Sequence, residues 1–210
     1  AQVAADARLH LYSRPVDESQ ASTRLTGSIP MTERIDHDFQ ISPDSKRVYF
    51  LTLETIYGEY GSVDHARLYG APIDGASVAK RLADIGGYAQ DFSVSPDGTW
   101  LVYSVLIFDE SGADPYRTEL FSVPTDGHRE PILLSSATRS SMEGFRIADR
   151  RVVFVASPPA GAGEELISIT LEGTDRVVLG GTQLPLRGVT QFVLAPDRSR
   201  VVYLADQRTR

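Results

Sequence analysis

Short runs of alternating apolar and polar residues dominate this chain. The clearest examples are "DFQISPDSKRVYFL" at residues 38–51 and "DFSVSPDGTWLVYS" at residues 91–104, with weaker copies starting at Gly144 and Gln191. In each copy two alternating segments flank a tight turn. A period of two residues around a turn predicts an antiparallel β-hairpin. The chain also lacks the apolar spacing of an amphipathic helix, so we expect an all-β fold.

A second motif alternates with the first along the chain. It reads "LYSRPVD" from Leu11, "LYGAPIDG" from Leu68, "LFSVPTDG" from Leu120 and "LISITLEG" from Leu166. A short apolar run follows each copy after a polar turn, which predicts a second hairpin. One repeat therefore contains four antiparallel strands, called A, B, C and D in chain order.

The repeats recur at a nearly constant interval. The phenylalanines that mark the A strands lie 53, 53 and 47 residues apart, at Phe39, Phe92, Phe145 and Phe192. This interval is close to that of β-propeller blades, and radial repetition of four-stranded sheets defines that architecture. The sequence thus predicts a β-propeller with four blade equivalents per chain. We expect the four phenylalanines to be buried between blades.

The two motifs resemble a known repeat family. The hairpin "F-x-(I/V)-S-P-D-(G/S)" followed by "L-(Y/F)-x-x-P-x-D-G" is similar to the PD40, or WD40-like, repeats of TolB-type propellers, over nearly the whole chain. Repeats of the same style occur in the propeller domains of tricorn and prolyl-oligopeptidase-type peptidases. The third copy has "IADRR" and the fourth "APDRS" in place of the Ser-Pro-Asp turn. The resemblance implies a fold, but it implies no particular ligand.

The order of the motifs raises the question of ring closure. A C-D hairpin at residues 9–26 comes first, blades at 38–84, 91–135 and 144–180 follow, and an A-B hairpin at 191–206 comes last. We expect the two hairpins to complete one blade, because this pairing would cover two open sheet edges. The pairing could close a four-bladed ring within one chain, or an eight-bladed ring in a homodimer. A longer parent chain is the third alternative.

Composition narrows the choice of partners. The net charge is −7 and the basic residues are scattered, which disfavours binding to nucleic acid or to an anionic membrane. No apolar run is long enough to span a membrane, and the absence of cysteine excludes disulfides and thiolate metal sites. A sequence that starts at Ala1 fits a mature product cut after a small residue or a trimmed chain. The first case predicts a periplasmic or secreted protein.

The connections divide between two ends of each blade. The A-B and C-D turns are tight and rich in Asp, Gly and Ser, whereas the B-C and D-A connections, such as residues 54–65 and 107–117, are long. We call these the turn end and the loop-rich end. Binding residues concentrate in long connections on a rigid scaffold, so we place the candidate binding face at the loop-rich end. The candidate residues are Asp36, His37, Asp38, Tyr57, Tyr60, Asp91, Asp109, Glu110, Asp114, Glu143 and Gln191.

Each part of this face has a functional and a structural interpretation. The residues before the A-strand phenylalanines could form an acidic collar that holds a cation or a basic peptide group. The structural alternative, which we favour, is that Asp38 and Asp91 bond backbone N–H groups. Tyr57 and Tyr60 could anchor a protein partner or pack on an adjacent blade. Residues 109–114 lack the ligand pattern of a calcium loop, and we expect a solvated loop.

The sequence supports three functional hypotheses. The first is a non-catalytic module that binds a protein or peptide at the loop-rich face or the channel mouth. The second is the substrate-selecting propeller of a serine peptidase whose catalytic domain is absent from these residues. The third is a metal-dependent enzyme at the channel mouth. We predict no cofactor and no catalytic residue, since no Gly-x-Ser-x-Gly elbow or glycine-rich phosphate loop is present.

Overall fold

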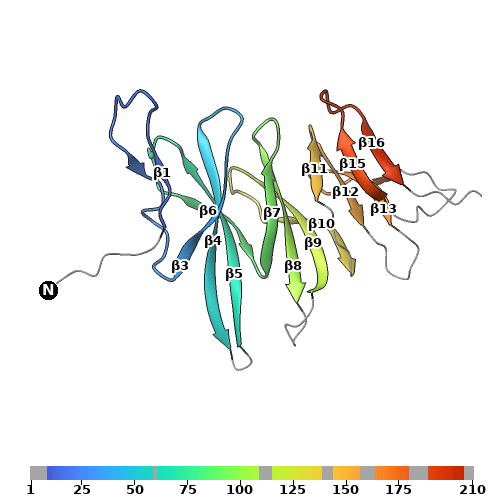
Figure 1. The fold of residues 1–210 in the computed structure, drawn as a ribbon, viewed down its shortest axis with the longest axis horizontal. Helices are drawn as coiled ribbons and strands as arrows, with labels where there is room; N and C mark the ends of the chain where they lie inside the picture. Colours follow the sequence, from blue (N-terminus) through green and yellow to red (C-terminus); the bar gives the residue numbers. More distant parts are fainter. Residues whose placement is uncertain are drawn as a thin grey trace, which may run out of the picture. The chain divides into compact units, whose positions relative to one another are not determined.

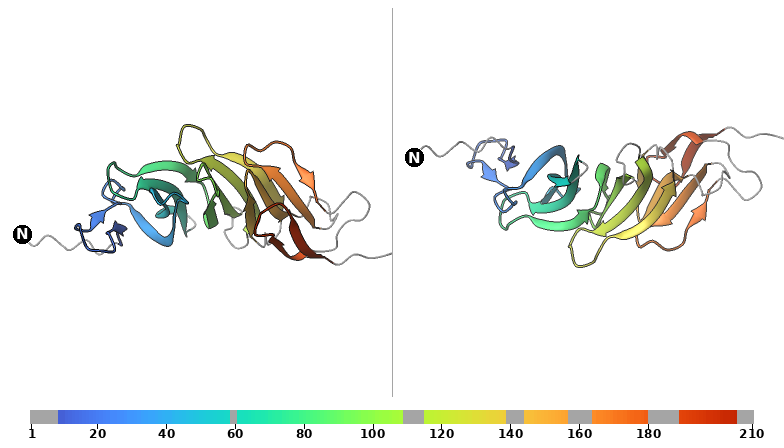
Figure 2. Two further views of the ribbon diagram at one scale, coloured as in Figure 1. Left: turned by 90° about the horizontal axis from the view of Figure 1, so that it is seen from above. Right: turned by 90° about the horizontal axis from the view of Figure 1, so that it is seen from below.

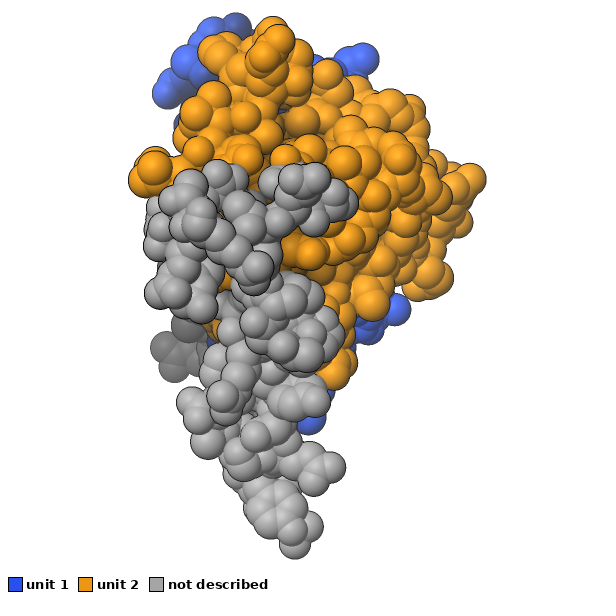
Figure 3. Space-filling view, turned by 90° about the vertical axis from the view of Figure 1, so that its right-hand side faces the viewer, with its two compact units in different colours: residues 1–86 blue, residues 87–210 orange. Residues whose placement is uncertain are grey.

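The computed structural model describes residues 9–58, 61–108, 115–138, 144–156, 164–179 and 189–205. By its internal contacts the chain divides into two compact units, Ala1–Gly86 and Gly87–Arg210 (Figure 3). The described residues form only strands, turns and irregular segments, so the predicted all-β fold is confirmed.

The first unit contains a small hairpin and one complete four-stranded sheet. The sheet has the order β3-β4-β5-β6 and is antiparallel throughout (Figure 1). We call it blade 1. Leu11 and Leu25 of the hairpin region pack on Phe50 and Tyr69 of the blade. The strands are β1 (Tyr12–Ser13), β2 (Thr23–Arg24), β3 (Glu33–Ile41), β4 (Arg47–Gly58), β5 (Gly61–Pro72) and β6 (Lys80–Ile85).

The second unit contains two complete sheets and a second hairpin. Blade 2 consists of β7–β10, blade 3 of β11–β14, and β15 pairs with β16 alone. Each sheet follows chain order, as the repeated hairpins predict. The strands are β7 (Tyr88–Val94), β8 (Trp100–Phe108), β9 (Pro115–Pro124), β10 (Ile132–Thr138), β11 (Phe145–Ala148), β12 (Arg151–Ala156), β13 (Glu165–Thr170), β14 (Val177–Val178), β15 (Val189–Leu194) and β16 (Val201–Ala205).

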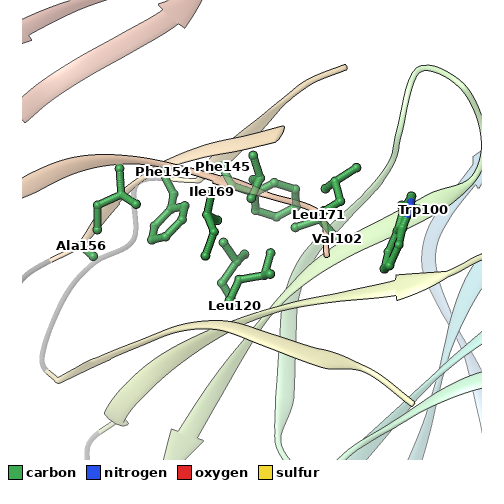
Figure 4. Close-up of a cluster of buried hydrophobic side chains, with 11 residues drawn as sticks. Trp100, Val102, Leu120, Phe145, Phe154, Ala156, Ile169 and Leu171 are labelled. Carbon is green, nitrogen blue, oxygen red and sulfur yellow. The ribbon is translucent and has the colours of Figure 1, made fainter. Parts of the chain in front are cut away.

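A large core cluster lies between blades 2 and 3. Trp100 and Leu120 of blade 2 meet Phe145, Phe154 and other apolar side chains of blade 3 (Figure 4). Strand β12 is apolar on both faces because it is covered on both. Its even-numbered side chains belong to the cluster shared with blade 2, while Val153 belongs to a cluster shared with the β15–β16 hairpin. Figure 2 shows the strands of this second unit from two further sides. Trp100 itself is buried at 8% exposure.

The Ser-Pro-Asp motif holds the A-B turns together. In blade 2, Ser95 Oγ donates to Asp97 Oδ1 at 2.6 Å and accepts from the N–H of Trp100 at 2.9 Å. Asp97 Oδ1 also accepts from the N–H of Thr99. The residue after the aspartate has a left-handed backbone, with φ of 58° at Ser45, 73° at Gly98 and 57° at Arg198, and glycine adopts this conformation at the least cost. The motif is therefore part of the scaffold.

Two structural features explain the glycine of the C-D motif: the backbone conformation of the turn and the close approach of a neighbouring strand. Gly75 and Gly173 both have positive φ. A Cβ at Gly173 would lie 2.8 Å from Ile132 of strand β10, and a Cβ at Gly75 would collide with Thr23 of strand β2. In both places a C-D turn lies against the D strand of the preceding sheet. Glycine thus permits close approach between neighbouring sheets.

Two expectations require correction. Phe145, Phe92 and Phe192 are buried, but Phe39 is 53% exposed. Phe145 and Phe192 each contact a core cluster that includes the preceding blade, whereas only a two-stranded hairpin precedes blade 1. The second correction concerns the loops. The expected B-C loop of blade 1, residues 54–65, is strand up to Gly58 and again from Gly61, because β4 and β5 pair out to these two glycines.

Closure of a ring remains a prediction. Strands β1 and β2 form one two-stranded sheet, and β15 and β16 form another.

The described part of the chain contains no helix with the length and apolar character of a membrane span.

Candidate functional site

Three of the four A strands, β3, β7 and β15, share an irregularity just before the marking phenylalanine. Pairing shifts between Ile35 and Phe39 in β3, between Ala89 and Asp91 in β7, and between Val189 and Gln191 in β15. Such β-bulges bend a strand and re-aim its side chains, and they are frequent beside functional sites. The predicted acidic positions therefore coincide with a structural feature that recurs in both units.

In blade 1 a group of charged residues supports the beginning of β3. Arg67 lies between three carboxylates, 2.8 Å from Glu54, 3.3 Å from Glu33 and 3.6 Å from Asp84. Its side chain is 12% exposed. Burial acts to lower the pKa of Arg67, but the bond to Glu54 and the charges of Glu33 and Asp84 outweigh it and raise the pKa. Arg67 therefore remains positively charged. Asp84 also contacts His65, with 2.5 Å between the carboxylate oxygen and Nε2.

Glu33 is the most buried member of this charged group. Its carboxylate accepts hydrogen bonds from Thr52 Oγ1 at 2.5 Å and from the Tyr69 hydroxyl at 3.3 Å. Burial and the negative charge of Glu33 raise the pKa of Tyr69 to about 12, which keeps Tyr69 a donor at neutral pH. A buried carboxylate with this many partners fixes its own position. It holds the first residue of β3, so the bulge at Asp36 starts from a rigid point.

The other supports of the loop-rich end are simpler. Arg34 follows Glu33 in strand β3 and lies on the opposite face of the sheet. Its guanidinium donates two hydrogen bonds to Asp64, at 2.7 and 3.2 Å, and the hydroxyl of Thr55 donates to the same carboxylate. In the second unit, Glu164 accepts from the N–H of Val189 at 3.1 Å, directly before the bulge of β15. The bulged segments are therefore tied to their neighbours by side-chain hydrogen bonds in both units.

The predicted site residues have different outcomes. Asp36 is half-buried, whereas Asp38, Asp91 and Gln191 are exposed on the bulged strands. Tyr57 is 83% exposed near the end of β4. The remaining positions lie outside the described residues or, for His37, have an undescribed side chain, and they stay predictions: His37, Tyr60, Asp109, Glu110, Asp114 and Glu143.

The charged group around Arg67 was not predicted from sequence. One signal was available, because Glu33, Thr52, Arg67 and Asp84 occupy one face of the sheet in the observed register. The common face is recognised only when the pairing register of the strands is known, and the extended B-C ribbon of blade 1 was expected to be a loop. Among the described residues there is no group of three or more His, Asp or Glu side chains arranged to hold a metal ion.

Comparison with known proteins supports the propeller architecture. No family model matches the chain. It is 33% identical over 127 residues to Dipeptidyl-peptidase 5 from Porphyromonas endodontalis, a match that covers 60% of this chain and 17% of that protein. The chain therefore matches less than a fifth of that relative's length.

Two solved structures have the same fold. A puromycin hydrolase superposes with a TM-score of 0.59 at 18% identity, over 95% of this chain and 32% of its own. The β-propeller domain of the Trilobed protease from Pyrococcus furiosus, described as having an open velcro topology, superposes with a TM-score of 0.51 at 9% identity. That match covers 82% of this chain and 48% of the domain. The chain is thus a β-propeller sequence whose blades resemble those of peptidases.

Proposed function

We propose that this chain is a non-catalytic propeller that binds peptides for a peptidase and selects among them. The observation that supports the proposal most strongly is the 33% identity to part of a dipeptidyl-peptidase. The matched part is a minor share of that protein, as expected if the repeats are an accessory domain. The peptidase activity would then reside elsewhere, either in the same protein or in a partner.

We place peptide binding at the loop-rich end of the blades. Asp38 in the first unit and Asp91 in the second are each exposed beside a bulge, and each carboxylate by itself would attract an N-terminal ammonium or a basic side chain. Tyr57 and Ile56 are exposed on the β4–β5 ribbon and provide apolar contact area. Peptides with a free amino terminus are therefore the ligands of choice, and a folded protein partner is the second candidate. A periplasmic or secreted location would suit this role and remains a prediction.

Fluorescence anisotropy with labelled short peptides tests this proposal. We expect a peptide with a free amino terminus to bind more tightly than its acetylated form, and added salt to weaken the difference. Asp38→Asn and Asp91→Asn should each reduce affinity roughly two- to fivefold, the range of an exposed ion pair.

The matched control is Glu130→Gln, which removes an exposed carboxylate from the C-D turn of blade 2 at the turn end. Its affinity should equal that of the unmodified chain. Equal affinity of all three variants for every peptide would place binding elsewhere. Failure of all peptides to bind, together with capture of a folded protein, would favour the protein-binding alternative.

A further inference from the structure

The two middle strands of blade 1 extend beyond their neighbours at the loop-rich end. Strand β3 pairs with β4 only as far as Glu33 with Glu54, and β6 pairs with β5 only as far as Ile85 with Ala66. Strands β4 and β5 continue together to Gly58 and Gly61 and run past β3 and β6 (Figure 1). We call residues 55–58 and 61–64 the ribbon arm.

The chain before β3 turns away from the ribbon arm. Two backbone hydrogen bonds close successive turns there, from the N–H of Ile29 to Thr26 and from the N–H of Glu33 to Pro30. The segment that leads into β3 therefore does not continue along β4. In the part of the chain that the structure describes, β4 has no strand partner on its β3 side from Thr55 onward.

Ionic contacts hold the base of the ribbon arm on both faces of the sheet. On one face Arg34 donates to Thr55 at 2.9 Å and to Asp64 at 2.7 and 3.2 Å. The bond from Arg34 keeps the pKa of Asp64 below its ordinary value, so this carboxylate is charged at neutral pH. On the other face Arg67 lies 2.8 Å from Glu54. The arm is thus oriented before any ligand arrives, which reduces the ordering cost of binding.

The open edge of the arm presents backbone groups. Residues of an antiparallel strand direct their N–H and C=O groups alternately to the two sides, and β5 satisfies only one side of β4 here. The groups on the other side match the hydrogen-bonding pattern of an extended peptide, which is the basis of recognition by strand addition.

The residues along this edge lack the usual protection against added strands. Exposed edges commonly carry Lys, Pro or other charged residues, which discourage pairing. Strand β6, the opposite edge of blade 1, follows this rule with Lys80, Arg81 and Asp84. Residues 55–57 of the arm read Thr-Ile-Tyr, which are uncharged residue types that favour β-strands. The sequence therefore permits pairing at the arm and opposes it at β6.

The exposed side chains of the arm indicate what such a strand would carry. Ile56 is 47% exposed and Tyr57 is 83% exposed. As neighbours in one strand, they lie on opposite faces of the ribbon. Consecutive residues of an added strand also alternate between these faces, so one would lie beside Tyr57 and the next beside Ile56.

We propose that the ribbon arm binds an extended peptide as an added strand along residues 55–58 of β4. The inference rests on the proposed function, and it adds the mode of binding and the class of ligand. The preferred ligands are unstructured peptides with two neighbouring apolar residues. Charged residues at these two positions would be rejected, because they would face Ile56 and Tyr57.

Backbone methylation of the ligand tests strand addition directly. The probe is a fluorescein-labelled octapeptide with a free amino terminus and Val-Phe at its centre. Methylation of one backbone nitrogen at a time removes one donor. We expect affinity to fall roughly two- to tenfold at every second residue of the paired segment, the range of one hydrogen bond, and to change little at the residues between them.

Variants of the arm test the apolar preference. The unmodified chain should prefer the Val-Phe peptide to the same peptide with Ser-Ser at its centre. Tyr57→Ser and Ile56→Ser should each reduce this preference roughly three- to tenfold. The matched control is Val78→Ser, which replaces an exposed apolar residue in the C-D turn at the opposite end of blade 1 and should leave the preference unchanged.

Arg34→Gln separates positioning from contact. It loosens the base of the arm, so it should weaken binding of the Val-Phe and Ser-Ser peptides by the same factor. Hydrogen exchange at residues 55–57 should become faster in this variant, whereas Tyr57→Ser should leave exchange at Thr55 unchanged.

The outcomes distinguish this inference from the proposed function. Methylation losses without a period of two, or arm variants that bind the Val-Phe peptide as tightly as the unmodified chain, would overturn strand addition at the arm. The proposed function would still stand if Asp38→Asn and Asp91→Asn weakened peptide binding in the same assay. Absence of binding by every peptide would overturn both.

Discussion

Strands β3 and β11 carry the same marking phenylalanine, yet the two side chains lie in different surroundings. Phe145 of β11 is 3% exposed and contacts a core built from blades 2 and 3, whereas Phe39 of β3 is 53% exposed. Both pair with a buried phenylalanine across the strand, Phe154 and Phe50 respectively. The local sheet is therefore equivalent in the two places, and the difference lies in what precedes it.

This comparison shows that one repeat does not determine its own burial. A propeller blade is apolar on both faces because a neighbouring blade covers each face in the folded protein. Phe145 has a complete blade before it, while Phe39 follows a hairpin of only two strands. Among the described residues, exposure of Phe39 thus follows from the small size of the sheet that precedes blade 1.

The largest expected effect comes from truncating the two phenylalanines. Phe145→Ala should lower the free energy of unfolding by about 3–5 kcal/mol through lost burial and a cavity. Phe39→Ala should lower it by less than about 1 kcal/mol in the monomer, because half of the side chain is already in water. Urea denaturation at low protein concentration measures both values.

Equal losses of stability for the two variants at low concentration would mean that Phe39 is buried within a single chain. The comparison between β3 and β11 would then fail.

A smaller effect is expected in the A-B turns of a complete and an incomplete blade. Ser95→Ala in blade 2 removes the partner of the Trp100 N–H and of Asp97, at a cost of about 1–3 kcal/mol for unsatisfied buried groups. The β15–β16 hairpin naturally has Ala195 at this position. Ala195→Ser should add about 0.5–1 kcal/mol, the net value of a new hydrogen bond. Thermal unfolding followed by circular dichroism would measure both, and a destabilised Ala195→Ser variant would show that the turn of this hairpin differs.

The sequence predicted the repeated parts of the molecule and missed the parts that depend on neighbours. Alternation around a turn identified the hairpin containing Phe92 and Val102, since local pattern and turn chemistry decide it. The charged group at Glu33 and Arg67 needed strand register across three strands, and exposure of Phe39 needed knowledge of the preceding sheet. The acidic positions Asp38 and Asp91 were predicted as candidates from sequence, but the β-bulges beside them were not.

The smallest expected effect is electrostatic and concerns the aspartates of the same turns. The hydroxyl of Ser42 and the N–H of Lys46 hold the pKa of Asp44 below its ordinary value in blade 1. In the β15–β16 hairpin the pKa of Asp197 is lowered by the backbone and side chain of Ser199 instead. Ser42→Ala should therefore raise the pKa of Asp44 towards its ordinary value and leave that of Asp197 unchanged. Carboxyl-carbon NMR titration measures both groups in one experiment.

The sign of the pH effect follows from the lowered pKa of Asp44. A carboxyl whose pKa is lower in the folded state adds stability above its unfolded pKa, and this contribution is lost as the pH falls through the folded value. The unmodified chain should thus lose stability below about pH 4 more steeply than the Ser42→Ala variant. Identical acid unfolding curves, with an unchanged Asp44 titration, would mean that Ser42 does not control the turn. The turn of blade 1 would then depend on its backbone bonds, from the N–H of Ser45 to Ser42 and from the N–H of Ser42 to Arg47.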